Sequence, residues 1–366
     1  MIIERISILN FKNIEEADLV FSPKMNYLFG NNGMGKTNFL DALHYLSFCK
    51  SRSNLQDYQL IRSEEDFCVI QGYYSDRGMH EEIYCGIKRK HRKVFKRNKK
   101  EYERLSDHIG LIPLVMVSPE DIDLIRGGSD GRRKFVDQLI SQYDKEYLNA
   151  LIHYNKALIQ RNSLLKESMA FSEDSLFDIL DEQLCYYGEL IYKKRKRFLE
   201  AYLLVFREYH RQICNDGDSV DLIYESHLDN FHLDQLLTDR RERDKIVGYT
   251  SAGIHKDDFL FLLDGHLIRK VGSQGQNKTY LIALKLAQFF FLVQQGLSTP
   301  LLLLDDIFDK LDASRVEQIV KLVSLPEFGQ IFITDTNRKY LDDILKRIDQ
   351  NYKLFQVDKG KIEDLK

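Results

Sequence analysis

Hydrophobic positions in the first 117 residues fall in short runs separated by polar turns, the pattern of β-strands. The predicted strands are Ile2–Leu9, Leu19–Phe21, Met25–Phe29, Cys68–Tyr74, Glu82–Lys88, Lys93–Arg97 and Leu111–Val117. Ser118-Pro119 ends the last run, which is apolar enough to be fully buried. The first third of the chain is therefore predicted to be mainly β-structure.

The pattern changes to helical spacing between about residues 130 and 215, where proline and glycine are almost absent. The apolar series begins with Phe135, Leu139, Tyr143 and Tyr147. We predict long helices that form a hairpin-like lobe. Beyond it, Leu222–Tyr224 and Phe259–Leu263 are predicted strands on either side of a polar segment.

One glycine-rich stretch predicts a phosphate-binding loop. Residues 30–37, GNNGMGKT, follow the predicted strand Met25–Phe29 and lead into a predicted helix. Glycines let successive N–H groups face a phosphate at a helix N-terminus, the lysine reaches the β- and γ-phosphates, and the hydroxyl binds Mg²⁺. The predicted ATP-binding residues are Gly30, Asn31, Asn32, Gly33, Met34, Gly35, Lys36, Thr37 and Asn38. Lys36 is also predicted to be catalytic, and Thr37 to be a metal ligand.

A second stretch predicts the partner of that loop. Leu301–Leu304 is apolar like a buried parallel strand, and Asp305 and Asp306 follow it directly. Ligands bind beyond the carboxyl ends of such strands. We expect Asp305 to hold Mg²⁺, directly or through water, and Asp306 to polarise the attacking water. Taken alone, the stretch is equally compatible with a strand followed by a polar turn.

Composition narrows the class of protein. The chain has 366 residues, 43% of them hydrophobic, which is ample for a buried core. No apolar stretch reaches the roughly 20 residues of a membrane span, and the N-terminus lacks a signal-peptide layout. The 5 cysteines are widely spaced and form no CxxC pair, so neither a disulfide framework nor a zinc site is predicted. We expect a reducing, cytoplasmic location and no membrane partner.

The net charge of −3 excludes a uniformly basic nucleic-acid binder but not local basic patches. Lys88–Lys100 contains nine Lys or Arg and no acid. Its candidate contacts to DNA phosphates are Lys88, Arg89, Lys90, Arg92, Lys93, Lys96 and Arg97. The alternative is a solvated hairpin with a turn at Asn98-Lys99. A second run, Lys193–Arg197, is interpreted as the solvated face of a helix.

A polar hexapeptide, Ser273–Lys278, precedes the strongly apolar predicted helix Thr279–Gln294. N–H groups at a helix N-terminus can contact a phosphate. The same residues could simply cap the helix.

In order and spacing, these motifs resemble those of ABC-type ATPases. In that class, the Ser-Gly-Gln turn of one subunit contacts the γ-phosphate held by another. The resemblance implies that Ser273, Gly275 and Gln276 complete the ATP site of a second copy, with Ser273 catalytic. It also implies a D-loop at Asp309–Asp312, while Thr334 stands where many ABC ATPases carry His.

The start of the chain, Ile8–Asn13, resembles the SMC-like branch of ABC ATPases that act on DNA. Three stretches resemble the RecF family of bacterial recombination mediators: Ser118–Asp137, Gly248–Asp258 and Ser273–Gln276. The similarity covers essentially the whole chain. The family usually has Pro where Ser129 and Ile254 stand, and Ser/Ala-Glu where Asp309-Lys310 stands.

This resemblance implies an α/β fold: an ABC-type P-loop ATPase head with a mixed sheet and a helical second lobe inserted in the chain. Residues 1–117 and 248–366 would form the head, and residues 118–247 the lobe. It further implies a DNA repair and replication protein of the SOS response that forms a homodimer on ATP and binds double-stranded or gapped DNA. With RecO and RecR it would load recombinase at single-strand gaps. ATP and Mg²⁺ are the implied cofactors, and weak, DNA-stimulated ATP hydrolysis would reset the protein.

The alternative is an ABC-type ATPase subunit that drives a non-DNA partner, either a transporter or a scaffold. The long separation of Lys36 from Asp305 disfavours the transporter subunit. The predicted helices are also too short for a long SMC-like coiled coil.

Overall fold

The computed structural model describes residues 1–53, 55–167, 174–214, 217–307, 313–336 and 352–365. It divides into two compact units. The first comprises residues 1–121 and 282–366, and the second comprises residues 122–281. Across the described residues, no helix combines the length and apolar character that a membrane span requires.

One sheet of the first unit is antiparallel throughout. Its strand order is β2-β1-β4-β5-β6-β7. The strands are β1 (Ile2–Phe11), β2 (Ile14–Val20), β4 (Phe67–Asp76), β5 (Met79–Lys88), β6 (Val94–Arg97) and β7 (Lys100–Glu101). Asn98 and Lys99, with φ of 50° and 69°, form the turn between β6 and β7. This confirms the turn that was predicted for the basic stretch.

The other sheet of this unit is mixed, with the order β15-β14-β3-β13-β12-β8. Its strands are β3 (Met25–Phe29), β8 (Leu114–Val117), β12 (Leu301–Asp305), β13 (Ile331–Asp335), β14 (Tyr352–Asp358) and β15 (Lys361–Asp364). All neighbours are parallel except β14 and β15. The strands β8, β12 and β13 are buried along their whole length, as continuous apolar runs predict.

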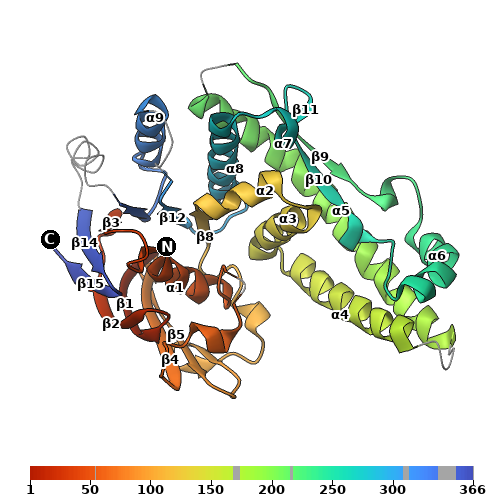
Figure 1. Ribbon diagram of the computed structural model, residues 1–366, viewed down its shortest axis with the longest axis horizontal. Coiled ribbons are helices and arrows are strands. Elements are labelled where there is room, and N and C mark those ends of the chain that lie inside the picture. The colour runs from red at the N-terminus through yellow and green to blue at the C-terminus, as the bar shows by residue number, and fades with distance from the viewer. Residues whose placement is uncertain (54, 168–173, 215–216, 308–312, 337–351, 366) are drawn as a thin grey trace. The chain divides into compact units, whose positions relative to one another are not determined.

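Helix α1 (Lys36–Phe48) packs against both sheets (Figure 1). It contacts β8, β12 and β13 of the mixed sheet and β1, β4 and β5 of the antiparallel sheet. Eleven of its 13 residues are buried, as expected of a helix that is apolar on most of its faces. Phe39 packs against Phe21 and Phe332, so the helix that follows the glycine-rich loop is anchored in the core.

The first unit also contains residues 282–294 of the helix α8 (Gln274–Gln294) and several short helices. The short ones are the 3₁₀ helices Asp57–Leu60, Leu105–Asp107 and Pro119–Asp121 and the α-helix α9 (Ala313–Val323).

The second unit is mainly helical. Its helices are α2 (Ile122–Arg126), α3 (Ser129–Tyr143), α4 (Lys145–Glu167), α5 (Asp174–Ile213), α6 (Leu233–Val247), α7 (Ile268–Val271) and the start of α8 (Gln274–Gln294). Helices α4 and α5 lie side by side as the predicted hairpin (Figure 1). The polar segment also contains α6, which the sequence did not predict because few of its side chains are apolar.

A three-stranded sheet and two 3₁₀ helices join these helices. The strands are β9 (Val220–Glu225), β10 (Asp258–Leu263) and β11 (His266–Leu267), and the 3₁₀ helices are His227–Asp229 and Ile254–Lys256. Residues 248–281, which were assigned to the head from the sequence, lie in this unit. The physical reason is that β10 pairs with β9 along its whole length and packs against α3.

Candidate nucleotide-binding site

The glycine-rich loop connects β3 to α1, as predicted. Gly33 and Gly35 have φ of 78° and 117°, a region of backbone conformation that side chains with a Cβ rarely adopt. A Cβ on Gly30 would lie 2.2 Å from the Val357 carbonyl oxygen. Glycine is therefore required at these positions by the shape of the backbone.

Lys36 folds back over the loop. Its Nζ donates to the carbonyl oxygens of Gly30, at 2.6 Å, and Asn31, at 3.0 Å. Burial lowers the pKa of Lys36, and the carboxylates of Asp306 and Asp305 oppose that shift. The ammonium group is thus held at the centre of the loop, facing carboxylates across the site.

Asp305 ends β12, and the structure brings it to Thr37 although the two lie far apart in sequence. The Thr37 Oγ1 donates to Asp305 Oδ2 at 2.9 Å. Asp305 is only 3% exposed. Asp306 follows in a left-handed conformation, with φ of 47°. Thr37 and Asp305, the two residues predicted as metal ligands, are therefore in direct hydrogen-bond contact.

A cavity of about 150 Å³ opens between the loop and these carboxylates. It is lined by Asn32, Gly33, Gly35, Lys36, Thr37, Asn38, Asp305 and Asp306. Within the described ranges, no three His, Cys, Asp or Glu residues form a metal cluster. Mg²⁺ does not need one, because it binds through one or two carboxylates, substrate phosphates and water. A hydroxyl beside a single buried carboxylate therefore fits this ion.

Sequence reasoning missed the contribution of Asn13. Its Nδ2 donates to the Met34 carbonyl at 3.2 Å, and its Oδ1 accepts from Asn38 Nδ2 at 2.8 Å. Asn13 lies between β1 and β2 and ties the loop to the start of α1. It ended the SMC-like stretch Ile8–Asn13, but nothing in the local pattern indicated its contact.

Ser273, Gly275 and Gln276 lie at the N-terminus of α8 in the second unit. Ser273 Oγ accepts from the Gln276 backbone N–H at 3.1 Å, and Gln276 Oε1 accepts from the Ser273 N–H at 3.0 Å. This is a capping box, so the capping interpretation is correct. The Ser273 hydroxyl is exposed, and its oxygen is the acceptor from the Gln276 N–H. Its proton is not used in that bond and can be donated to another group. The predicted D-loop, Asp309–Asp312, lies outside the described residues.

The basic hairpin is only partly available for DNA. Lys93 Nζ lies 3.1 Å from Asp57 Oδ2 and donates to the Cys49 carbonyl at 2.6 Å. Arg97 Nε donates to Glu81 Oε2 at 2.8 Å. Lys93 is therefore committed to the fold of the first unit, whereas Arg97 is paired but exposed at the surface.

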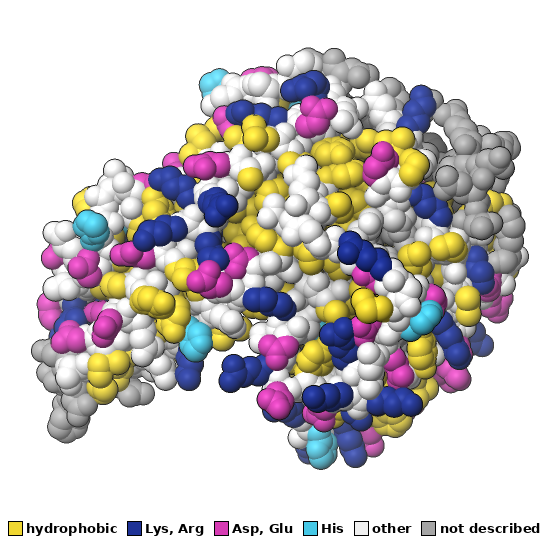
Figure 2. Space-filling model, turned by 180° about the vertical axis from the view of Figure 1, so that it is seen from behind, with side chains coloured by type: hydrophobic (Ala, Val, Ile, Leu, Met, Phe, Trp, Pro, Cys, Tyr) yellow, Lys and Arg dark blue, Asp and Glu magenta, His cyan; other side chains and the backbone are white. Residues whose placement is uncertain are grey.

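The other five candidates face solvent to different degrees. Arg89 Nε donates to the Glu65 carbonyl at 2.9 Å, and Lys96 lies over the Tyr84 ring. Lys88, Lys90 and Arg92 are exposed. On the face shown in Figure 2, Lys and Arg are interspersed with Asp and Glu.

The interpretation of Lys193–Arg197 as a wholly solvated face is wrong for one residue. Arg195 is buried, with Nη2 2.8 Å from Asp137 Oδ1 and Nη1 3.1 Å from Asp257 Oδ2. It lies three residues before the buried Phe198, on the same face of α5. Its neighbours Lys193 and Lys196 pair with Glu189 and Asp229 at the surface.

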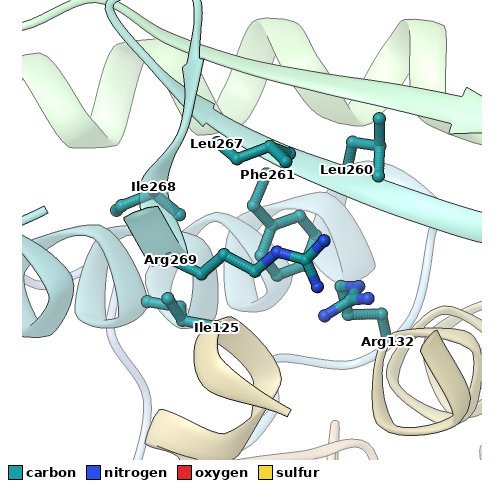
Figure 3. Close-up of a pocket in the computed structure, with 7 residues that line it drawn as sticks. All are labelled: Ile125, Arg132, Leu260, Phe261, Leu267, Ile268 and Arg269. Carbon is teal, nitrogen blue, oxygen red and sulfur yellow. The ribbon is translucent and has the colours of Figure 1, made fainter. Parts of the chain in front are cut away.

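Two of the RecF-like stretches meet in the second unit. Arg132 forms a bidentate pair with Asp258, at 2.8 Å and 2.9 Å, and Arg133 donates to the Asp257 carbonyl. Figure 3 shows Arg132 and Arg269 pointing toward the same gap beside Phe261. That cavity is only about 10 Å³, room for about one water. These arginines therefore do not line a substrate-sized pocket.

Together, the fold and the site define a P-loop ATPase of the ABC type. The model of the RecF/RecN/SMC N-terminal domain family matches residues 2–363. The chain is 60% identical, over 100% of both chains, to the DNA replication and repair protein RecF of Parabacteroides distasonis. It is 62% identical, over 100% of both chains, to the protein of that name from Azobacteroides pseudotrichonymphae. The chain belongs to the RecF family.

Solved structures agree with this assignment. A structure of the recombination mediator protein RecF-ATP in the RecFOR pathway superposes with a TM-score of 0.89 and 31% identity. It covers 100% of this chain and 98% of that chain. The Smc head domain of Pyrococcus furiosus, at 19% identity, has a TM-score of 0.57, covers 100% of this chain and 96% of that one, and shows the shared fold alone.

Proposed function

We propose that this protein is an ATP-dependent DNA-binding repair protein that dimerises on ATP, binds duplex or gapped DNA and helps load recombinase at single-strand gaps. The observation that carries the proposal is the meeting of Lys36, Thr37 and Asp305 around one cavity. It occurs in a chain whose full length matches curated RecF proteins.

The site residues divide the work of ATP hydrolysis. Lys36, released from the Gly30 and Asn31 carbonyls, neutralises charge on the β- and γ-phosphates. Thr37 and Asp305 hold Mg²⁺, which when bound polarises the same phosphates. Asp306 orients the attacking water. The resulting ATPase is weak and stimulated by DNA, and hydrolysis releases the protein from DNA.

A second copy completes the site through its own Ser273. Because that hydroxyl acts as an acceptor toward the Gln276 N–H, its own proton can be donated to a γ-phosphate. Gly275 and Gln276 present backbone N–H groups in the first turn of α8, where an anion is favoured. Each ATP would then be held between the first unit of one copy and the α8 N-terminus of the other copy.

In this proposal, the exposed residues Lys88, Lys90 and Arg92 of the basic hairpin make the main DNA contacts, and Arg89 and Lys96 make additional ones. Because these residues would contact phosphates and not bases, the affinity depends on salt concentration and not on the DNA sequence. RecO and RecR are the proposed protein partners in loading recombinase. The proposed location is the cytoplasm, because the chromosome on which the complex would act lies there. These assignments rest on membership of the RecF family.

Two substitutions test the ATP part of this proposal. Lys36→Met removes the phosphate-binding ammonium and is expected to abolish ATP binding or hydrolysis. Ser273→Arg is expected to bind ATP as a monomer and to fail to dimerise, because it blocks only the site in trans. ATP binding by equilibrium dialysis and mass by light scattering distinguish the two effects. A Ser273→Arg protein that dimerises and hydrolyses ATP normally would contradict the sandwich.

A further inference from the structure

Thr334 occupies a buried position directly beside the two acidic residues of the site. It lies near the C-terminal end of β13, in parallel register with Asp305 of β12. Its side chain is 0% exposed, and a buried hydroxyl must have hydrogen-bond partners to be tolerated.

The direction of its hydrogen bonds can be assigned from the groups involved. The Asp306 backbone N–H can only donate, and it lies 3.1 Å from Thr334 Oγ1. The hydroxyl therefore accepts there and gives its single proton to Asp305 Oδ1, at 2.6 Å. With its proton used in this way, Thr334 is directed at the carboxylate and not at a phosphate.

Each of these bonds constrains one acidic residue. Asp305 Oδ1 accepts from the Thr334 hydroxyl, and the carboxylate so held lies against Thr37 Oγ1, with Oδ2 at 2.9 Å and Oδ1 at 3.1 Å. Asp306 has a φ of 47°, a left-handed conformation that is uncommon for residues with a side chain. Two bonds fix its N–H in that conformation, one to the Thr334 hydroxyl and one, at 3.2 Å, to the Thr334 carbonyl.

We infer that Thr334 is a positioning residue of the ATP site: its hydroxyl orients Asp305 for Mg²⁺ and fixes the backbone from which Asp306 reaches the attacking water. The inference rests on the proposed function, because it assigns the use of the same two carboxylates. Partners that hold a metal ligand from behind typically contribute about 10- to 100-fold to metal affinity or activity.

The test compares Thr334→Val, which removes the hydroxyl and keeps the branched shape, with Thr334→Ser, which keeps the hydroxyl. Binding of a fluorescent non-hydrolysable ATP analogue is titrated with Mg²⁺, and again in EDTA. For Thr334→Val, the Mg²⁺ concentration at half-maximal binding is expected to rise about 10- to 100-fold. Binding in EDTA stays unchanged, and Thr334→Ser restores the wild-type Mg²⁺ requirement.

A double-mutant cycle separates positioning from a general structural role. In an Asp305→Asn background, Thr334→Val should add little to the Mg²⁺ requirement, because the two residues act through one contact. Circular dichroism checks the fold, and Thr334→Ala replaces the valine variant if that variant does not fold.

Three results would overturn the inference. The first is an unchanged Mg²⁺ requirement in Thr334→Val, and the second is an equal loss of binding with and without Mg²⁺. In the third, the wild-type protein binds the analogue with no effect of Mg²⁺. This last result would refute the proposed metal site itself, whereas the first two leave it intact.

Discussion

A histidine in the second unit is held neutral by the groups around it. His255 Nε2 lies 3.0 Å from the Thr250 carbonyl, so it carries the ring proton, and Nδ1 accepts from the Tyr154 hydroxyl at 2.8 Å. Burial lowers the pKa of His255 from 6.5 to about 4. His255 belongs to the RecF-like stretch Gly248–Asp258, and both of its nitrogens serve the fold.

The first prediction follows from this pKa. In the unfolded chain the imidazole titrates near its ordinary pKa of 6.5, so between pH 6.5 and 4 the unfolded state binds a proton that the folded state does not. The free energy of unfolding therefore decreases as the pH is lowered. His255 accounts for about 2 kcal/mol of that decrease between pH 7.5 and pH 5. Urea unfolding of wild type and His255→Gln checks it. The variant should lose that part of the pH dependence, and parallel pH profiles would contradict the assignment.

At the scale of elements, the basic hairpin contains two neighbouring basic residues with different roles, one in stability and one proposed in DNA binding. Lys93 is turned inward, where its ammonium bonds to Asp57, the Tyr45 hydroxyl and the carbonyl of Cys49 after α1. Arg92, next to it, is exposed. The hairpin therefore provides a matched pair of basic residues, one structural and one proposed to contact DNA.

Substitution of the pair separates stability from DNA binding. Lys93→Ala is expected to lower the free energy of unfolding by about 1–3 kcal/mol, because it leaves buried polar groups without their partner. Arg92→Ala should change stability by less than about 0.5 kcal/mol. It should instead weaken duplex binding and reduce the slope of log affinity against log salt by about 1. Urea unfolding and fluorescence anisotropy measure the two effects, and reversed roles for the two residues would contradict the hairpin model.

The elements that sequence predicted well are those whose pattern is local. Strand β12 is apolar up to Asp305, strand β3 is apolar except for Asn26, and the glycine-rich loop between β3 and α1 has fixed spacing. Helix α6 was missed because only four of its side chains are buried. Strand β14 has polar residues between its apolar ones and is stabilised by parallel pairing with β3, which no local pattern reveals.

Within the candidate site the same distinction holds. The residues of the loop were predicted from motifs, and so were Asp305, which ends β12, and Asp306, which follows it. Asn13 and the bonds of Thr334 depend on contacts between segments distant in sequence, and they emerge only from the fold. Arg195 was misjudged because a run of like charges conceals which member faces the core of the second unit.

At the scale of the whole molecule, ATP is proposed to control DNA binding through dimerisation. A chain with a net charge of −3 has no general attraction for DNA. Two copies joined by ATP would present two basic hairpins at once, and the second contact would then be intramolecular. Affinity for DNA should therefore rise with dimer formation and fall when ATP is hydrolysed.

The most direct measurement is salt-titrated binding to duplex and gapped DNA with ATP, with ADP and without nucleotide, run beside light scattering on the same samples. The account predicts that ATP alone produces a dimer and strengthens DNA binding, with a steep dependence on salt, and that Ser273→Arg loses both effects together. An ATP-dependent dimer that fails to bind either DNA at low salt would contradict the proposed link between ATP and DNA.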